Sequence, residues 1–222
     1  MKQPKKILYY GKDEPLAKQI EIKAGPLSLF YEAGDLRYIK FNEKEIVRRV
    51  YVAVRDHNWD TIIPAISNIQ INSSVDSFKI TYDVKHIQND VNFIWKAEIV
   101  GKSDGSIRFN MFGEALTTFW RNRIGFCILL PMDYAGSKTQ INHVDGTVEE
   151  SVFPKYIAPQ LIIEGKPSPV EPFSNMRGLM LNITPKMMAE LHFDGDIFEM
   201  EDQRNWTDAS FKTYGTPLRE PS

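Results

Sequence analysis

Hydrophobic and polar residues alternate along most of this chain, and turn-forming residues interrupt the alternation at short intervals. In the run 91–100, for example, every second residue from Val91 to Ile99 is apolar. Such runs, bounded by Gly, Pro, Asn and Asp, are typical of antiparallel strands joined by tight turns. The pattern predicts strands at 7–11, 20–22, 27–31, 36–40, 69–71, 78–84, 91–100, 107–112, 124–130, 141–144, 147–152, 176–183 and 187–193.

The run Glu45–Asp56 fits two patterns. Its apolar residues approximate helical spacing, but Val50, Val52 and Val54 also share one face of a strand. Because β-branched residues pack well on a pleated surface, the run favours a strand. On that interpretation Arg49 and Arg55 lie on the opposite face. The segment 114–120 predicts a short helical or irregular piece before the apolar strand at 124–130.

These elements predict an all-β fold, an antiparallel β-sandwich. At 222 residues, one large domain spanning 1–222 is expected, with a loose C-terminal end from about residue 215. A Pro-rich segment at 154–172 predicts a long crossing loop with polyproline II character. His86 is expected on the surface, close to a turn.

Composition and charge narrow the function classes. The net charge is −2, with no Lys/Arg cluster, so neither nucleic acid nor a membrane surface is an expected partner. No signal peptide or membrane span is recognisable, and the lone Cys127 predicts a buried, inert thiol, so a cytoplasmic location is expected. The chain lacks a Gly-rich phosphate loop, paired cysteines and a nucleophile elbow, so no cofactor and no metal are predicted.

The stretch 194–214 concentrates carboxylates, amides, an arginine and aromatic rings. Asp194-Gly195 is a hairpin signal, and in the strand after it Glu199 and Glu201 would project from one face about 6.5 to 7 Å apart. A sugar or sugar-acid pocket uses these groups together with a flat apolar platform. The further candidate ligand-binding residues of this stretch are Asp202, Arg204, Asn205, Trp206 and Asp208.

Two other segments carry candidate cationic and aromatic groups. Arg121 and Arg123 are two residues apart, so in a strand they point the same way, either toward an anion or carbonyl oxygen, or toward Glu199 and Glu201 as structural ion pairs. After the strand at 45–56, the candidates are Arg55, His57 and Trp59. They would serve a polar ligand with an anionic group, or else form a loop that caps the core.

His143 precedes the Asp145-Gly146 hairpin signal. Histidine is a natural general acid or base near neutral pH, but a histidine beside a hairpin is also common as polar surface.

Three sequence blocks carry a family resemblance: RRVYVAVRDHNW (48–59), RNRIGF (121–126) and EMEDQRNWTDASFKTY (199–214). Together they resemble the amino-terminal β domain of the D-apionate lactonase family, whose typical members continue into a TIM-barrel-like region and a further β domain. The opening turns and strands more weakly resemble the galactose-mutarotase-like β-supersandwich. The resemblance implies a sandwich of that supersandwich type and hydrolysis of a sugar lactone such as D-apionolactone, or the β domain of an enzyme that performs it.

The resemblance also suggests roles for the candidate residues. Ester hydrolysis needs a base for water and a donor for the oxyanion. Glu199 or Glu201 would be the base, with His143 as the alternate, and Arg123 or Arg204 the donor. Two other functions stay open: a non-catalytic carbohydrate-binding or partner-docking module, and a mutarotase-like aldose epimerase. The resemblance also suggests a protein partner, which would be either a barrel-containing polypeptide or a second copy of this chain.

Overall fold

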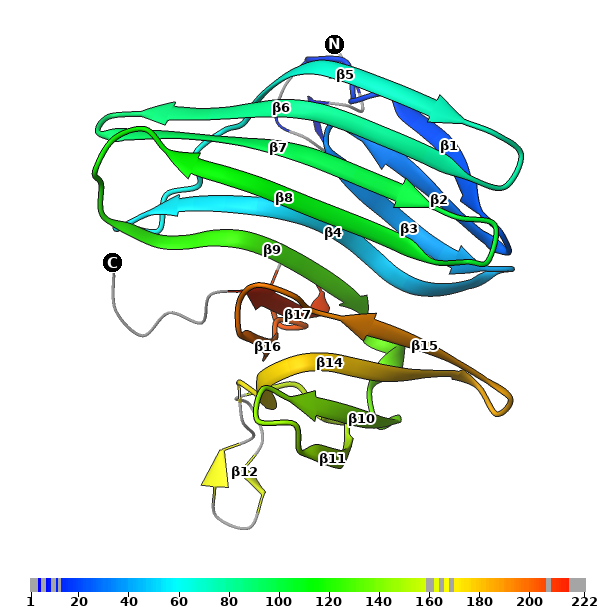
Figure 1. The fold of residues 1–222 in the computed structure, drawn as a ribbon. Coiled ribbons are helices and arrows are strands. Elements are labelled where there is room, and N and C mark those ends of the chain that lie inside the picture. Colours follow the sequence, from blue (N-terminus) through cyan, green and yellow to red (C-terminus); the bar gives the residue numbers. More distant parts are fainter. Residues whose placement is uncertain are drawn as a thin grey trace.

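The structure is a computed structural model of the chain, and it describes residues 4, 7–8, 11, 13–158, 162–163, 166–167, 170–206 and 209–215. Two sheets form the main body (Figure 1). The smaller sheet is a meander of four antiparallel strands: β5 (Ala65–Ser73), β6 (Phe78–Gln88), β7 (Val91–Gly101) and β8 (Ile107–Ala115). In Figure 1 it lies over the part of the larger sheet that contains β1 to β4 and β9.

The larger sheet has eleven strands in the order β1-β2-β3-β4-β9-β17-β16-β14-β10-β11, with β15 also paired to β14. Every pairing in it is antiparallel. Its first strands are β1 (Gln19–Ala24), β2 (Leu27–Glu32), β3 (Asp35–Phe41), β4 (Lys44–Asp56) and β9 (Arg121–Pro131). The others are β10 (Lys138–His143), β11 (Val148–Val152), β14 (Phe173–Thr184), β15 (Met187–His192), β16 (Phe198–Asp202) and β17 (Ser210–Gly215). A 3-10 turn, Met132–Tyr134, follows β9, and the short strands β12 (Ile162–Ile163) and β13 (Lys166–Pro167) form a separate pair.

β17 occupies an interior position of the larger sheet, although it is the last strand in the described part of the chain. It pairs with β9 on one side and with β16 on the other. Residues from the middle and from the late part of the chain therefore become direct neighbours, and Tyr214 faces Cys127 on β9 and Glu199 on β16.

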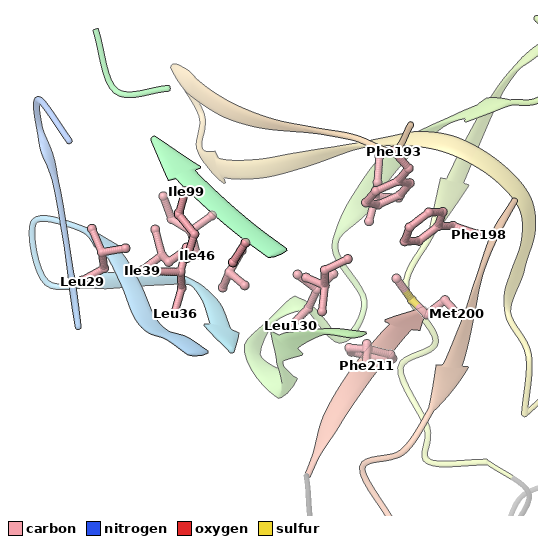
Figure 2. Close-up of a cluster of buried hydrophobic side chains, with 14 of the residues drawn as sticks. Leu29, Leu36, Ile39, Ile46, Ile99, Leu130, Phe193, Phe198, Met200 and Phe211 are labelled. Carbon is pink, nitrogen blue, oxygen red and sulfur yellow. The ribbon is translucent and has the colours of Figure 1, made fainter. Parts of the chain in front are cut away.

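One continuous apolar core runs between the sheets and on under the strands that extend beyond the smaller sheet. Figure 2 shows Leu29, Leu36, Ile39 and Ile46 of the larger sheet beside Ile99 of β7. Farther along, Phe193, Phe198, Met200 and Phe211 gather, with Leu130 between the two groups. The rings of Phe193 and Phe198 stack with their centroids 4.4 Å apart.

The predicted all-β antiparallel sandwich is confirmed. The run 45–56 is a strand and not a helix: Val50, Val52 and Val54 face the core, whereas Tyr51 and Ala53 pack on the other side of the sheet. The segment 116–120 is irregular, and β8 continues to Ala115. Parts of the Pro-rich segment and the end after 215 lie outside the described residues.

The prediction that His86 lies on the surface is wrong. β6 continues to Gln88, and the imidazole is only 1% exposed. Trp95 Nε1 donates to His86 Nε2 at 3.1 Å, and His86 Nδ1 lies 2.9 Å from the carbonyl oxygen of Ile62. Because Nε2 accepts, Nδ1 carries the proton, and burial lowers the pKa of this histidine despite the carbonyl contact.

The expected hairpin at Asp194-Gly195 is also absent from the structure. β15 and β16 do not pair with each other, because both lie along the same side of β14. Asp194-Gly195 instead connects two strands that follow one another along that side. A dipeptide favours a turn, but only the hydrogen-bonding partners decide whether the turn closes a hairpin.

Gly25 is where the turns of the two sheets touch, and it provides a test of the sandwich. Its φ is +52°, and a Cβ there would lie 2.3 Å from the carbonyl oxygen of Ser103 in the β7–β8 turn. The left-handed backbone alone costs an alanine about 1–2 kcal/mol, and the clash adds to it. We expect Gly25→Ala to lower the free energy of unfolding, measured by urea denaturation, by clearly more than Gly146→Ala. Gly146 also has a positive φ, but its added Cβ would meet nothing within 4 Å. Equal losses in the two variants would contradict the close approach.

Candidate functional site

The larger sheet has two faces with different chemistry. Core residues of β4, β9, β17 and β16 occupy one face. The opposite face, called the outer face here, carries polar and charged side chains in register across these four strands. Two cross-strand rows define it, Tyr51–Cys127–Tyr214–Glu199 and Arg49–Leu129–Lys212–Glu201.

Tyr214 lies at the centre of the outer face and is almost fully buried. The guanidinium carbon of Arg123 is 3.4 Å from the centre of its ring, a cation–π contact. Its hydroxyl donates to a carboxylate oxygen of Glu201 at 2.5 Å. Burial raises the pKa of Tyr214, and its hydrogen bonds to Glu201 and Glu199 raise it further, so the phenol stays a proton donor.

Glu199 and Glu201 point to this phenol from β16, and both are half-buried. Burial raises the pKa of Glu199; nearby Glu171 and Glu201 act in the same direction, whereas Tyr214 and Arg123 oppose them. Glu201 is more fully engaged, because it also accepts a hydrogen bond from the Gln203 amide at 2.5 Å. The two predicted catalytic carboxylates therefore differ in their surroundings, and burial disfavours the ionised form of Glu199.

Cations and aromatic rings alternate along the same face. The guanidinium carbon of Arg49 lies 4.0 Å from the centre of the Tyr51 ring, and Lys212 Nζ lies 5.9 Å from it. Lys212 is only 4% exposed. Small residues, Ala53 and Cys127, separate these groups from Tyr214 and pack with it. The thiol of Cys127 is buried, as the sequence predicts.

Arg55 and Trp59 extend the outer face at the end of β4. Arg55 is the cross-strand partner of Arg123. Trp59 follows in the loop, 47% exposed, with its ring centre 5.5 Å from the guanidinium carbon of Arg123. His57 lies in the same loop with its side chain exposed, and its carbonyl accepts a hydrogen bond from the Asn122 amide.

Asp202 and Arg204 are bonded to each other and to the protein backbone. The Asp202 carboxylate is fully buried; it accepts hydrogen bonds from Arg204 Nε and Nη2 at 2.8 Å each and one from the backbone N–H of Ala158. Arg204 also donates to the carbonyls of Lys155 and Tyr156. Because these groups have partners within the protein, they hold the 155–158 segment against β16 and are not available to a ligand.

The remaining candidates lie apart from the Tyr214 cluster. Arg121 lines an open hollow of about 800 Å³ between the ends of β7, β8 and β9, together with Phe93 and Asp196. The predicted convergence of Arg121 and Arg123 is therefore not seen. His143 is on β10, separated from β16 by β14, where its Nε2 lies 3.1 Å from a Glu149 oxygen.

Asn205 and Trp206 lie in the turn between β16 and β17, and the Trp206 side chain is 51% exposed. That turn is beside Asp202, whereas Arg123 and Trp59 are toward the other end of the strands. Asp208 lies outside the described residues.

The hollow at Arg121 does not contain the groups best suited to chemistry, since Glu199, the Tyr214 phenol and the buried guanidinium of Arg123 converge on the outer face instead. The structure thus brings together Glu199, Glu201 and Arg123, with Arg55 and Trp59 beside them. The sequence interpretation missed Tyr214 and Lys212. Their spacing of two in a strand opposite the glutamates was a usable signal, but the register of that pairing is not written in the sequence.

The described part of the chain contains no group of three or more His, Cys, Asp and Glu side chains placed to hold a metal ion. None of its helices is long and apolar enough to cross a membrane.

Comparisons with known proteins identify the family. Residues 7–222 match the family model described as D-apionate lactonase, N-terminal domain. The chain is also 39% identical over 216 residues to the D-apionate lactonase of Brucella anthropi; the match covers 96% of this chain and 34% of that protein. The chain thus spans about a third of the relative's length. On this evidence, the chain belongs to the D-apionate lactonase family and corresponds to its N-terminal domain.

Proposed function

We propose that this chain serves the hydrolysis of a sugar lactone such as D-apionolactone, and that the Tyr214 cluster of the outer face is where the lactone reacts. The observation that carries the proposal is the half-buried Glu199, with its raised pKa, beside the buried Arg123 and the Tyr214 phenol. Membership of the family supports the substrate class, and the cluster supplies the groups that ester hydrolysis needs.

The geometry fits a base-assisted attack of water. Ionised Glu199 takes a proton from the water molecule as its oxygen bonds to the lactone carbonyl carbon. The carbonyl oxygen then becomes an oxyanion, which the Arg123 guanidinium stabilises. When the tetrahedral intermediate collapses, the ring C–O bond breaks, the ring oxygen takes the proton that Glu199 holds, and a hydroxy acid is released. Glu201, hydrogen-bonded to Tyr214 and Gln203, acts as a positioning residue.

A second candidate function is a saccharide-binding module that docks on a catalytic polypeptide. One observation favours it: the cluster lies on a sheet face instead of in an enclosed cavity. In that case the outer face binds the sugar acid or lactone, and the reaction takes place on other residues.

A rate measurement on the full chain tests the proposal. With D-apionolactone in a pH-stat, we expect acid release above the uncatalysed rate, and Arg123→Met should reduce that release about 10²- to 10³-fold, the usual effect of losing one oxyanion donor. Arg108→Met, an exposed arginine on β8, is the matched control and should keep the rate. Thermal melting of each variant checks that the fold is intact.

If the unmodified chain released no acid but bound the sugar saturably, the catalytic proposal would be refuted and the saccharide-binding module would be the remaining function. A folded Arg123→Met variant with full activity would remove Arg123 from the reaction.

A further inference from the structure

Two arginines face each other directly on the outer face. Arg55 of β4 and Arg123 of β9 are cross-strand partners, so their side chains leave the sheet on the same side. Like charges in directly opposed positions destabilise a sheet. An arginine cannot relieve the repulsion by losing its proton, because its pKa lies above the range in which proteins function.

Each of the two guanidinium groups also has one buried N–H without an acceptor. Within the part of the chain that the structure describes, neither Arg55 Nε nor Arg123 Nε has a hydrogen-bond partner, although both atoms are buried. Arg123 is only 4% exposed. The charge of Glu199 offsets part of that of Arg123. None of the ion pairs between described residues involves Arg55. A buried donor without an acceptor is costly, so a site of this kind is prepared for an anion.

The loop beside the arginines has an unusual backbone. Trp59 has a φ of +70°, which a bulky side chain rarely adopts. The loop is held in place by Asp56, whose carboxylate accepts the backbone N–H groups of Asn58 and Asp60, and whose carbonyl accepts that of Trp59. Such strain often occurs at functional sites, and here it places an exposed indole over Arg123.

We propose that Arg55 and Arg123, with Trp59 as a stacking platform, form a carboxylate site that binds the open-chain sugar acid released by lactone hydrolysis. The inference rests on the proposed function for its substrate class. Two guanidinium forks suit the two oxygens of one carboxylate, whereas the glutamates close by repel a dianion such as phosphate. The ring of Trp59 suits the C–H groups of a polyol chain. The neutral lactone gains no ion pair here, so the acid binds more tightly than an uncharged sugar and inhibits as product.

Titration calorimetry on the full chain tests the site without turnover. Sodium D-apionate should bind saturably, and at least tenfold more tightly than D-apiose, sodium acetate or inorganic phosphate. Arg55→Met should weaken D-apionate binding about 10- to 100-fold, as expected for the loss of a charge-assisted hydrogen bond. Arg55→Lys should restore part of the affinity, since it keeps the charge and loses the fork. Arg108→Met is the control, and thermal melting checks the fold of each variant.

Three outcomes would overturn the site. Equal affinities for D-apionate and D-apiose would show that the site does not recognise the carboxylate. Equal affinities for acetate and D-apionate would show that it does not recognise the sugar chain. A folded Arg55→Met variant with unchanged D-apionate affinity would refute the arginine pair even if lactone hydrolysis is observed. Conversely, D-apionate binding that depends on Arg55 without any hydrolysis would refute the catalytic proposal and leave this site standing.

Discussion

Asp202→Asn should lower the free energy of unfolding at pH 7 by about 3–5 kcal/mol, the usual cost of removing one member of a buried ion pair. The reason is the guanidinium that remains: Arg204 is 8% exposed, and two of its four acceptor contacts, at Nε and Nη2, come from this carboxylate. The loss also releases the backbone N–H of Ala158. Urea denaturation, followed by tryptophan fluorescence, measures the change.

The effect of Asp202→Asn should depend on pH. Burial raises the pKa of Asp202, but the bonds from Arg204 and the Ala158 N–H outweigh it, so the net pKa lies below the usual value. A carboxylate with a lowered folded-state pKa contributes stability above its unfolded pKa and loses it as the pH falls through the folded one. The two proteins should therefore converge in stability as the pH falls below about 4.

Glu98→Gln is the matched control for Asp202→Asn. It also converts a paired carboxylate into an amide, but the ion pair between Glu98 and Lys79 is on the exposed side of the smaller sheet. No measurable loss is expected from it. If Asp202→Asn lowered the free energy of unfolding no more than Glu98→Gln does, the ion pair with Arg204 would not be what holds the 155–158 segment against β16.

Glu199→Gln should reduce lactone hydrolysis about 10²- to 10⁴-fold without reducing stability. The amide cannot take a proton from water, so the rate falls. Because burial raises the folded-state pKa of Glu199, the folded protein binds the proton more tightly than the unfolded chain does. Stability therefore decreases as the pH rises from the unfolded to the folded pKa, and the ionised form carries that cost at pH 7. Removing the charge should leave the melting temperature equal or higher.

The pH dependence of the rate adds a second measurement on Glu199. The rate of the unmodified chain should fall in acid with a midpoint above the ordinary range of a glutamate, because the base must be ionised. Glu149→Gln, an exposed carboxylate on β11, serves as the control and should keep both rate and midpoint. Full activity in a folded Glu199→Gln variant would assign the base role elsewhere.

Short-range patterns predicted most of the strands, but the strand predicted at 7–11 is wrong: Ile7 and Leu8 are helical, and the Gly11 N–H donates to the Ile7 carbonyl. The strand at 45–56 follows from its β-branched residues, and the opposite placement of Val52 and Tyr51 follows from the period of two. The pattern of apolar and polar residues could not predict which strands pair when they are far apart in the sequence. Asp194-Gly195 looks like a hairpin turn, but β14 offers both neighbouring strands a place, so the turn closes no hairpin.

For the candidate site, the sequence could predict only which residues of one strand share a face, because side chains alternate between the two faces of a strand. Glu199 and Glu201 share a face because they are two residues apart, and Arg123 lies near them because β17 pairs with β9 on one side and with β16 on the other. Asp202 and Arg204 are residue types that ligand sites also use. Only the structure shows that both are buried and that they form an ion pair with each other. Arg121 is one strand period from Arg123 but lines the hollow at the end of β9.

The interior position of β17 has a consequence for synthesis on the ribosome. Strands β1 to β9 can pair as soon as they emerge, but β9 then exposes a bare hydrogen-bonding edge until about eighty further residues have been translated. Such an edge invites pairing with other nascent chains. Pairing of β17 with both β9 and β16 is also the event that brings the glutamates and Arg123 together, so the Tyr214 cluster should form only after β17 has emerged from the ribosome.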